Sequence, residues 1–585
     1  MIFRRQQGGA GRSPTRLVML TDGSAWSIHG APASARGAAA GQDEPKPLSL
    51  IPLPVLLPLV LLPLIPLPLF PLLLIPLPLF PLLLPLLLYA VRMAAVLWLA
   101  VLLVAVILLR YWWRERTLKK YPPGPPRWPL VGSLPYMPGT LIHLHAHQQW
   151  LSKYGSMVGL VAGNIPIVVV CGAEEVIAVL NHEQCQTRPK GFFFHERSFN
   201  RRLGIFFSDG PYWTAQRRFA LRELRDLGLG KTKLEGVVMD EVEATIATML
   251  RDGPELQPNK LFHAPVLNTL WWIVSGKPFS RGVGSSLDPQ SKRLLDIMDR
   301  AMRCKKIGNA PCDIWPLLKY VAPEWSSYND IYLPIFDMHE YIREEIRHQR
   351  KHGTGASFIG KYTEEINKAQ PGSYFDEESL IVSVLDLFTA GGESTANTLS
   401  FCLMYMVKYP AVQAKVHAEL DAVCTGPDHA VTMSDRARLP YLEATMAEVM
   451  RTNTIAPLAP PHEASEDVEM NGYIIPKGTM FLLSLWGVMH DKKHWGDPEA
   501  FRPERFIDSE GKFKKDPWLI PFGMGKRHCV GEGLAMQTAF LFFANLMNRF
   551  KFTLPPGSQA PPEVPQAGFT VGPQPFSVIA TPRNS

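Results

Sequence analysis

One cysteine near the C-terminus lies in a setting that suits a metal-bound thiolate. The stretch Pro521–Gly531 reads PFGMGKRHCVG and places Cys529 after a basic pair. Gly525 allows a tight turn whose backbone N–H groups can face the sulfur. Arg527 and the N-terminus of the helix expected just beyond this stretch both favour a charged thiol. A buried free cysteine is commonly inert, but these features together predict a metal-binding thiolate.

A long helix is expected over residues 376–407, and its middle carries polar groups. Gly391 and Gly392 interrupt its apolar run, and each costs about 1 kcal/mol inside a helix. Glu393 and Thr395 follow directly. One interpretation is that Thr395 bonds to the preceding turn and merely bends the helix. The other is that the glycines open a groove for a small ligand beside an acid and a hydroxyl.

Two further sets of polar residues occur at helical spacing. Trp213 and Arg217 are four residues apart, so an indole N–H and a guanidinium can donate to one anion. Glu448 and Arg451 are three apart and can pair, with Arg505 as a candidate third partner. At a surface such a pair contributes under about 1 kcal/mol, whereas a buried pair needs additional partners.

In this order along the chain, the motifs resemble those of the cytochrome P450 family. The family's haem-binding loop is matched at Phe522, Gly525, Arg527, Cys529 and Gly531. Ala390–Thr395 resembles its oxygen-activating motif, with Ser394 in place of the usual first threonine. Trp213 with Arg217 resembles the pair of its helix C, and Glu448 with Arg451 and Arg505 resembles its structural triad. The resemblance covers about residues 93–585.

The resemblance implies a predominantly α-helical α+β fold, the P450 fold with small β-sheets, preceded by an N-terminal membrane anchor. It implies haem b with Cys529 as axial ligand, and a close approach of the haem face at Gly531. The implied propionate partners are Trp213, Arg217, His462 and Arg527. Thr395 and Glu393 would deliver protons, and Thr395 is the hydroxyl expected to matter. The triad would hold the core near the haem loop.

The implied activity is insertion of one oxygen atom of O2 into a lipophilic substrate. Electrons would come from NADPH through a membrane-bound diflavin reductase, NADPH–cytochrome P450 reductase, with cytochrome b5 as a further candidate partner. The candidate docking residues form a basic face behind Cys529: Lys512, Lys514, Lys515, Lys526 and Arg527. The overall sequence pattern is most similar to that of arthropod members of the drug- and steroid-hydroxylating clan, which include juvenile-hormone epoxidases. A sesquiterpenoid or other lipid is therefore expected, against the lining candidates Phe388, Ala390, Leu458 and Phe569.

Two other classes of function stay open at this point. A haem-thiolate isomerase or dehydratase would need no reductase, but such enzymes usually lack the acid–hydroxyl pair of Glu393 and Thr395. A haem-binding protein without catalysis would need neither the proton relay nor an anchor. Oxygen consumption that depends on NADPH and reductase would separate these classes.

The composition and net charge of the chain limit the classes of protein that it can belong to. Hydrophobic residues make up 46% of the 585 residues, so a large core can form. The seven cysteines include no C-x-x-C pair, which argues against a disulfide framework or a zinc site and suits a reducing compartment. The net charge of +7 is too small to indicate nucleic-acid binding.

The N-terminal region is expected to have four parts. Residues 1–92 are expected to be a disordered, low-complexity extension whose prolines should exclude a continuous helix. One hypothesis is that this extension is not part of the natural protein. Residues 93–113 form the predicted anchor, close to the roughly 20 residues of a membrane span. Residues 114–132 form a basic, proline-rich hinge, and residues 133–585 the catalytic domain. The basic residues after the anchor predict that the chain beyond it lies in the cytosol, and the resemblance implies a single-pass protein of the endoplasmic reticulum membrane. A cleaved signal peptide is the alternative.

Overall fold

The computed structural model describes residues 80–138, 141–227, 232–279, 289–303, 310–353, 356–425, 429–568 and 570–583. The chain divides into two compact units, residues 1–96 and 97–585. Phe569 and most of the proline-rich extension lie outside the described residues.

A single helix, α2 (Phe80–Thr117), includes the segment predicted as an anchor. It begins before Met93 and contains Pro85, so the expectation that proline excludes helix was wrong for residues 80–92. Pro85 lies close to the helix N-terminus, where few backbone hydrogen bonds are lost. The part Leu88–Thr117 has 30 residues and is long and apolar enough to cross a bilayer.

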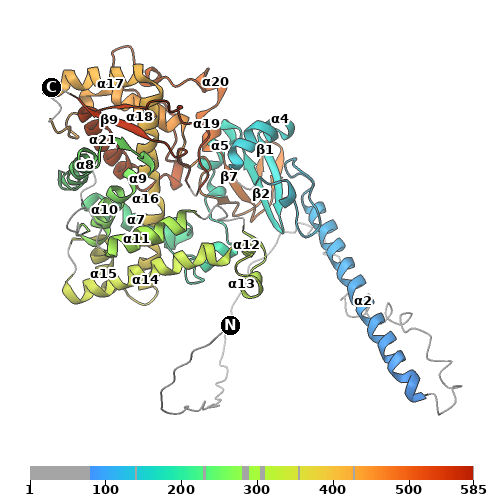
Figure 1. Cartoon of the computed structure of the whole chain (residues 1–585). Coiled ribbons are helices and arrows are strands. Elements are labelled where there is room, and N and C mark those ends of the chain that lie inside the picture. Colours follow the sequence, from blue (N-terminus) through green and yellow to red (C-terminus); the bar gives the residue numbers. More distant parts are fainter. Residues whose placement is uncertain are drawn as a thin grey trace, which may run out of the picture. The chain divides into compact units, whose positions relative to one another are not determined.

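The helix α16 (Glu377–Lys408) runs through the core of the second unit (Figure 1). Asp376 caps it and accepts a 2.7 Å hydrogen bond from the N–H of Ser379, and two glutamates occupy the first turn, where the helix dipole favours them. Apart from its middle, nearly every residue from Ser379 onward is buried. A helix buried on all sides can present functional groups from its centre.

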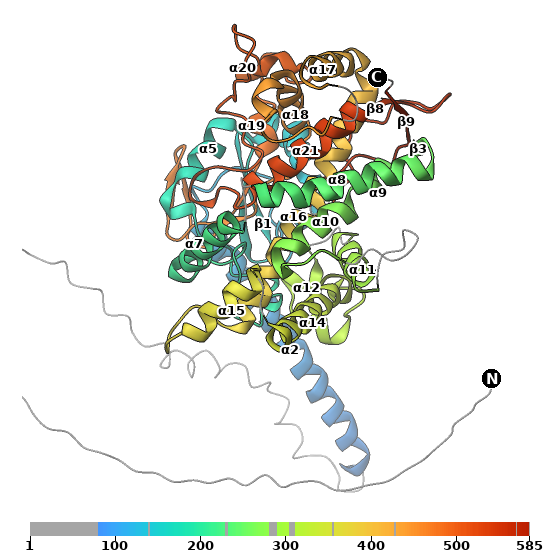
Figure 2. The ribbon, with the colours of Figure 1, turned by 90° about the vertical axis from the view of Figure 1, so that its left-hand side faces the viewer.

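Several long helices surround α16 (Figures 1 and 2). They are α7 (Gly210–Asp226), α8 (Thr232–Asp252), α10 (His263–Ser275), α11 (Pro289–Arg303), α14 (Tyr328–His352), α15 (Phe358–Lys368), α17 (Pro410–Val423), α18 (Pro440–Thr452) and α21 (Glu532–Arg549). Helix α21 lies beside both α8 and α16 (Figure 2). Together these helices bury one large apolar cluster.

Three small sheets complete the described fold. The largest has the order β1-β2-β7-β4, formed by β1 (Met157–Ala162), β2 (Ile165–Val170), β7 (Met480–Leu483) and β4 (His462–Glu463). Only β2 and β7 pair in parallel in this sheet. Strands β3 (Glu255–Leu256), β9 (Val578–Pro582) and β8 (Phe550–Thr553) form the second sheet, and β5 (Val468–Met470) pairs with β6 (Tyr473–Ile475).

The shorter helices connect these parts. They are α3 (Ile142–His145), η6 (Ala146–Trp150), α4 (Leu151–Tyr154), α5 (Ala173–Asn181), α6 (Phe192–Glu196), α9 (Pro258–Leu261), α12 (Pro311–Ile314), α13 (Leu318–Val321), α19 (Leu485–Met489) and α20 (Lys492–Trp495). The first three follow one another directly along the chain.

The proline-rich segment that follows α2 packs against strand β1. Tyr121 is buried, and the N–H of Gly159 in β1 donates to the carbonyl of Pro123 at 2.9 Å. A Cβ added at Gly124 would lie 2.0 Å from the carbonyl oxygen of Gly159, so only glycine permits this approach. The segment therefore fixes the chain to the edge of β1.

Candidate functional site

The loop around Cys529 is held by backbone hydrogen bonds. It contains the short helix η10 (Gly525–Arg527) and leads into α21. The N–H of Cys529 donates to the carbonyl of Phe522 at 3.0 Å. Gly525 has φ +70, and a Cβ there would lie 2.6 Å from the carbonyl oxygen of Leu180, so this position requires glycine. The N–H groups of Gly531 and Glu532 donate to the Cys529 sulfur, as expected at a helix N-terminus.

The Cys529 thiol is accessible although protein atoms surround it. Its side chain is exposed, yet desolvation by the surrounding protein raises its pKa. The two backbone N–H groups and the Arg217 guanidinium lower the pKa but do not offset burial. The cation that acts on the thiol is therefore Arg217, and not Arg527 as expected. A thiolate at this position needs a bound cation such as a metal.

Three arginines gather beside this thiol. The guanidinium of Arg527 lies 3.9 Å from the Trp213 ring centre, and that of Arg217 lies 5.6 Å from it. Arg188 is buried, and its pKa is lowered by burial and then by Arg527 and Arg217. The nearby carboxylate of Asp209 is paired with Arg202 at 2.7 Å. Among the described residues beside Cys529, the buried positive charge therefore exceeds the negative charge. This surplus fits the carboxylates of a haem.

The same tryptophan and arginine side chains also donate hydrogen bonds to backbone carbonyls of neighbouring loops. The Trp213 indole N–H donates to the carbonyl of Ile205 at 3.1 Å, and Arg217 donates to the carbonyl of His528 at 2.6 Å. Arg527 donates to the carbonyls of Gln186 and Ser208 at 2.8 and 2.9 Å. Arg527 therefore points into the protein, and its predicted place on a basic docking face was wrong.

The His462 side chain is less suited to bind a haem propionate than predicted. Its Nδ1 lies 2.7 Å from the carbonyl oxygen of Cys185, so Nδ1 carries the proton and a neutral ring offers only a lone pair at Nε2. Burial, with a contribution from Arg188, lowers its pKa to about 3. Arg188 is the stronger candidate for a propionate. Sequence reasoning missed it because a single arginine in a loop has no periodicity or motif of its own.

The middle of α16 is less buried than the rest of the helix. Ala390, Glu393 and Ser394 are half-buried, whereas Thr395 is buried. The Ser394 hydroxyl donates to the carbonyl of Ala390 at 2.7 Å. The carboxylate of Glu393 accepts a 2.6 Å hydrogen bond from the hydroxyl of Thr570, and burial raises the pKa of Glu393. An acid and a hydroxyl thus lie next to each other in this less buried part of the helix.

The two glycines of α16 have a packing role. A Cβ at Gly391 would lie 3.0 Å from Leu270, and one at Gly392 would lie 2.9 Å from Leu267. Both leucines belong to α10. The two glycines therefore let α10 approach α16 closely, and the ligand groove expected beside them stays a prediction.

A cavity of about 50 Å³ lies between α6, α11, α14 and α16. Its walls are mainly apolar: Phe193, Phe206, Phe207, Ile297, Met298, Ala301, Ile331, Pro334, Ile335, Met338 and Leu385, with Thr389, Arg197 and Asp386 as the other residues. Phe388 was predicted to contact substrate, but it is fully buried and packs against Trp271 of α10. Leu458 is half-buried and pairs with Ser484 beside the main sheet.

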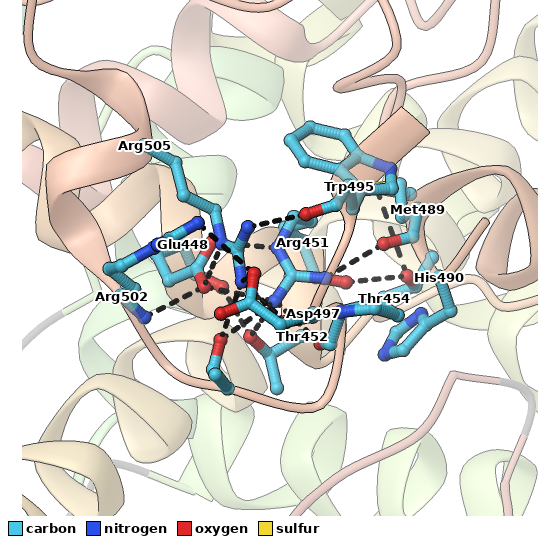
Figure 3. Close-up of polar contacts among 12 residues, drawn as sticks. Glu448, Arg451, Thr452, Thr454, Met489, His490, Trp495, Asp497, Arg502 and Arg505 are labelled. Atoms are coloured by element: carbon cyan, nitrogen blue, oxygen red, sulfur yellow. Dashed lines mark hydrogen bonds and ion pairs between the residues drawn. The ribbon is translucent and has the colours of Figure 1, made fainter. Parts of the chain in front are cut away.

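The polar triad forms a connected set of hydrogen bonds and ion pairs (Figure 3). Arg451 donates to both oxygens of Glu448 at 2.7 and 2.9 Å, and Arg505 donates to the same carboxylate at 3.2 Å. Neither Glu448 nor Arg451 is exposed. Arg451 also donates to the carbonyls of Met489 and Pro498, each at 2.8 Å. These additional partners are what a buried ion pair requires.

Comparison with known proteins agrees with this arrangement. The family model for cytochrome P450 matches residues 122–580. The chain is 36% identical to farnesoate epoxidase of Bombyx mori over 473 residues, 80% of this chain and 94% of the relative. It is 33% identical to probable cytochrome P450 305a1 of Drosophila melanogaster, covering 79% of this chain and 94% of the relative. It is also 33% identical to human cytochrome P450 2U1, covering 81% and 91%.

The chain belongs to the cytochrome P450 family. It is a haem-dependent monooxygenase, and its cofactor is iron protoporphyrin IX. The exposed thiol of Cys529 and the surplus of buried arginine charge both fit this group.

Proposed function

We propose that this enzyme oxidises an isoprenoid or similar lipid, by epoxidation or hydroxylation, and that Cys529 is the residue that would hold the haem iron. The observation that carries the substrate class is the similarity over nearly the full length of farnesoate epoxidase. The mainly apolar cavity beside α16 supports it, since apolar walls favour a lipophilic ligand. An isomerase without a reductase or a haem binder without catalysis would have no use for the acid and hydroxyl of α16.

Each functional residue of this chain has a distinct proposed role. A haem with a thiolate ligand supplies the chemistry of O–O cleavage. Cys529 would hold the iron, and Arg188, Arg217 and Arg527 would balance the charge of the propionates. Glu393 would relay protons. We assign the partner hydroxyl to Ser394 rather than Thr395, because Ser394 is half-buried and Thr395 is buried.

Electrons would arrive from NADPH through a diflavin reductase, or from cytochrome b5, at the surface behind Cys529. Lys512, Lys514, Lys515 and Lys526 are exposed there. Three of them make exposed ion pairs, Lys526 with Glu183 at 2.9 Å, Lys512 with Glu510 at 2.7 Å and Lys515 with Glu532 at 3.2 Å. Such pairs contribute little, so an acidic partner can displace them.

The endoplasmic reticulum membrane is the proposed location, with α2 as a single anchor and the catalytic domain in the cytosol. A second apolar surface supports membrane contact. Leu317, Tyr320, Val321 and Trp325, in and around α13, are 68–77% exposed. Contiguous exposed apolar side chains commonly mark a membrane or protein contact.

The decisive experiment measures oxygen and NADPH consumption by the full chain with reductase and, in turn, farnesoate, its methyl ester and a panel of other lipids. Product that contains one atom from labelled O2 is the expected result. Cys529→Ala should lose the absorption shift that carbon monoxide causes in a thiolate-ligated haem. If that shift persists in the variant, the ligand assignment is wrong; if it is lost but wild type gives no product from any lipid, only the substrate proposal fails.

A further inference from the structure

We propose that Arg197 anchors a neutral oxygen acceptor, such as an ester or ketone carbonyl, at one end of an otherwise apolar substrate. This inference deepens the proposed function and rests on it, because it concerns the same cavity. It specifies a polar group that the substrate carries and the residue that recognises that group.

Arg197 is an unusual residue for this position. Its side chain is only 3% exposed and lines the apolar cavity beside α16. Its Nη2 donates to Oδ1 of Asp386 at 2.5 Å, and its guanidinium lies 5.1 Å from the centre of the Phe207 ring. Its Nη1 is buried and has no hydrogen-bond partner among the described residues. An unpaired buried donor of this kind costs about 1–3 kcal/mol.

Asp386 cannot satisfy the remaining donor. Its Oδ2 accepts hydrogen bonds from the backbone N–H groups of Ile205 and Phe206, at 2.7 and 2.9 Å. Its Oδ1 accepts from Arg197. With these three donors the carboxylate is held rigidly between α16 and the loop before α7. The arginine is fixed by the same contacts, so the direction of Nη1 is set before any ligand arrives.

A ligand atom suits this donor better than water does. A buried water usually needs two to four polar partners. The other walls of the cavity are mainly apolar, and Thr389 is the one additional polar side chain among the described lining residues. A lipid whose oxygen-bearing end enters the cavity would place that end against the aromatic and aliphatic walls and present one oxygen to Arg197.

The charge of the site favours a neutral oxygen over a carboxylate. Arg197 and Asp386 form an ion pair whose net charge is zero. A ligand carboxylate would add an uncompensated negative charge beside Asp386, in a buried and mainly apolar space, which is costly. A carbonyl or ester oxygen accepts the hydrogen bond without that penalty.

The test measures binding, so it needs neither reductase nor turnover. Full-length holoenzyme is titrated by calorimetry with farnesene, farnesoate and the methyl ester of farnesoate. A second series uses a linear C12 alkane, acid and methyl ester. We expect the ester to bind about tenfold or more tightly than the hydrocarbon of its series, as a hydrogen bond to a charged donor implies, and more tightly than the acid.

Arg197→Lys keeps the positive charge beside Asp386 but removes the planar fork that leaves Nη1 free. It should lose the preference for the ester and bind the hydrocarbon as wild type does. Arg201→Lys is the matched control, because Arg201 belongs to the same loop but is 48% exposed and pairs with Asp376 and Glu378.

Equal affinity of wild type for ester and hydrocarbon in both series would overturn the proposal, whatever the variant does, and would indicate that water satisfies Nη1. Tighter binding of the acid than of the ester would also overturn it. If the isoprenoid series binds weakly but the linear series shows the ester preference, the proposed substrate class fails and the anchor stands. If Arg197→Lys does not fold, the wild-type series decides alone.

Discussion

The carboxylate of Glu393, in the middle of α16, accepts a 2.6 Å hydrogen bond from the hydroxyl of Thr570, which lies 177 residues further along the chain. Asn397, one turn later on α16, donates to the Thr570 hydroxyl at 3.4 Å and to the carbonyl of Val571 at 3.3 Å. The C-terminal segment therefore orients the acid that we assign to proton delivery.

Replacing either partner should reduce product formation more than oxygen consumption. Glu393→Gln removes the proton donor and Thr570→Val removes the group that orients it, so reducing equivalents are used without product. We expect a fall of about tenfold or more in product per NADPH for Glu393→Gln and a smaller fall for Thr570→Val. The ratio of product to NADPH is the measurement. Glu563→Gln, at an exposed ion pair with Lys408, should leave the ratio unchanged.

Glu393→Gln should also change how stability depends on pH. Burial raises the folded-state pKa of Glu393, so the folded state binds the proton more tightly than the unfolded state. The stabilisation is complete below the unfolded pKa of about 4.3 and is lost as pH rises through the folded pKa. The variant should therefore be more stable than wild type near pH 7, by about 0.5–2 kcal/mol, and the curves should converge below pH ~4. Denaturant unfolding at several pH values tests this; a constant difference would contradict it.

The two adjacent hydroxyls of α16 should not contribute equally. Ser394 is half-buried, whereas Thr395 is only 6% exposed. Ser394→Ala should therefore lower the product-to-NADPH ratio several-fold, while Thr395→Val, which preserves shape, should affect stability more than this ratio. The reverse order would return the proton-delivery role to Thr395, where the sequence first placed it.

Arg217 should be needed for haem retention. It donates to the carbonyl of His528, next to the ligand cysteine, at 2.6 Å, and its charge lowers the pKa of Cys529. Arg217→Leu should speed haem loss to an external acceptor by several-fold, because a charge-assisted contact contributes about 1.5–3 kcal/mol. Arg218→Leu is the control: Arg218 is exposed on the same helix, and its loss should leave the haem off-rate unchanged.

The buried triad should control stability rather than chemistry. Glu448→Gln leaves the fully buried guanidinium of Arg451 without its counter-charge, and such changes cost about 3–5 kcal/mol. Chemical denaturation of the holoprotein should show this loss, with product per NADPH close to wild type in the folded fraction. Arg502→Gln removes an exposed ion pair with Asp497 and should change stability by less than about 1 kcal/mol.

The sequence by itself determined the features that depend on short stretches of chain. The ligand loop around Cys529 and the acid–hydroxyl stretch of α16 are readable because their residues lie within about ten positions of one another. Helical spacing likewise brought Glu448 and Arg451 together, and the apolar run after Met93 indicated an anchor. Local spacing is preserved in the fold because a helix or tight turn fixes it.

Only the tertiary structure decided the directions and partners of side chains. It turned Phe388 towards Trp271, pointed Arg527 inward, and joined Arg197 to Asp386 across 189 residues. Such contacts form where distant segments pack, and a single arginine or threonine carries no local pattern that reveals its partner. Cavity walls are made of residues from several elements, so the anchor at Arg197 follows from packing and could not be read along the chain.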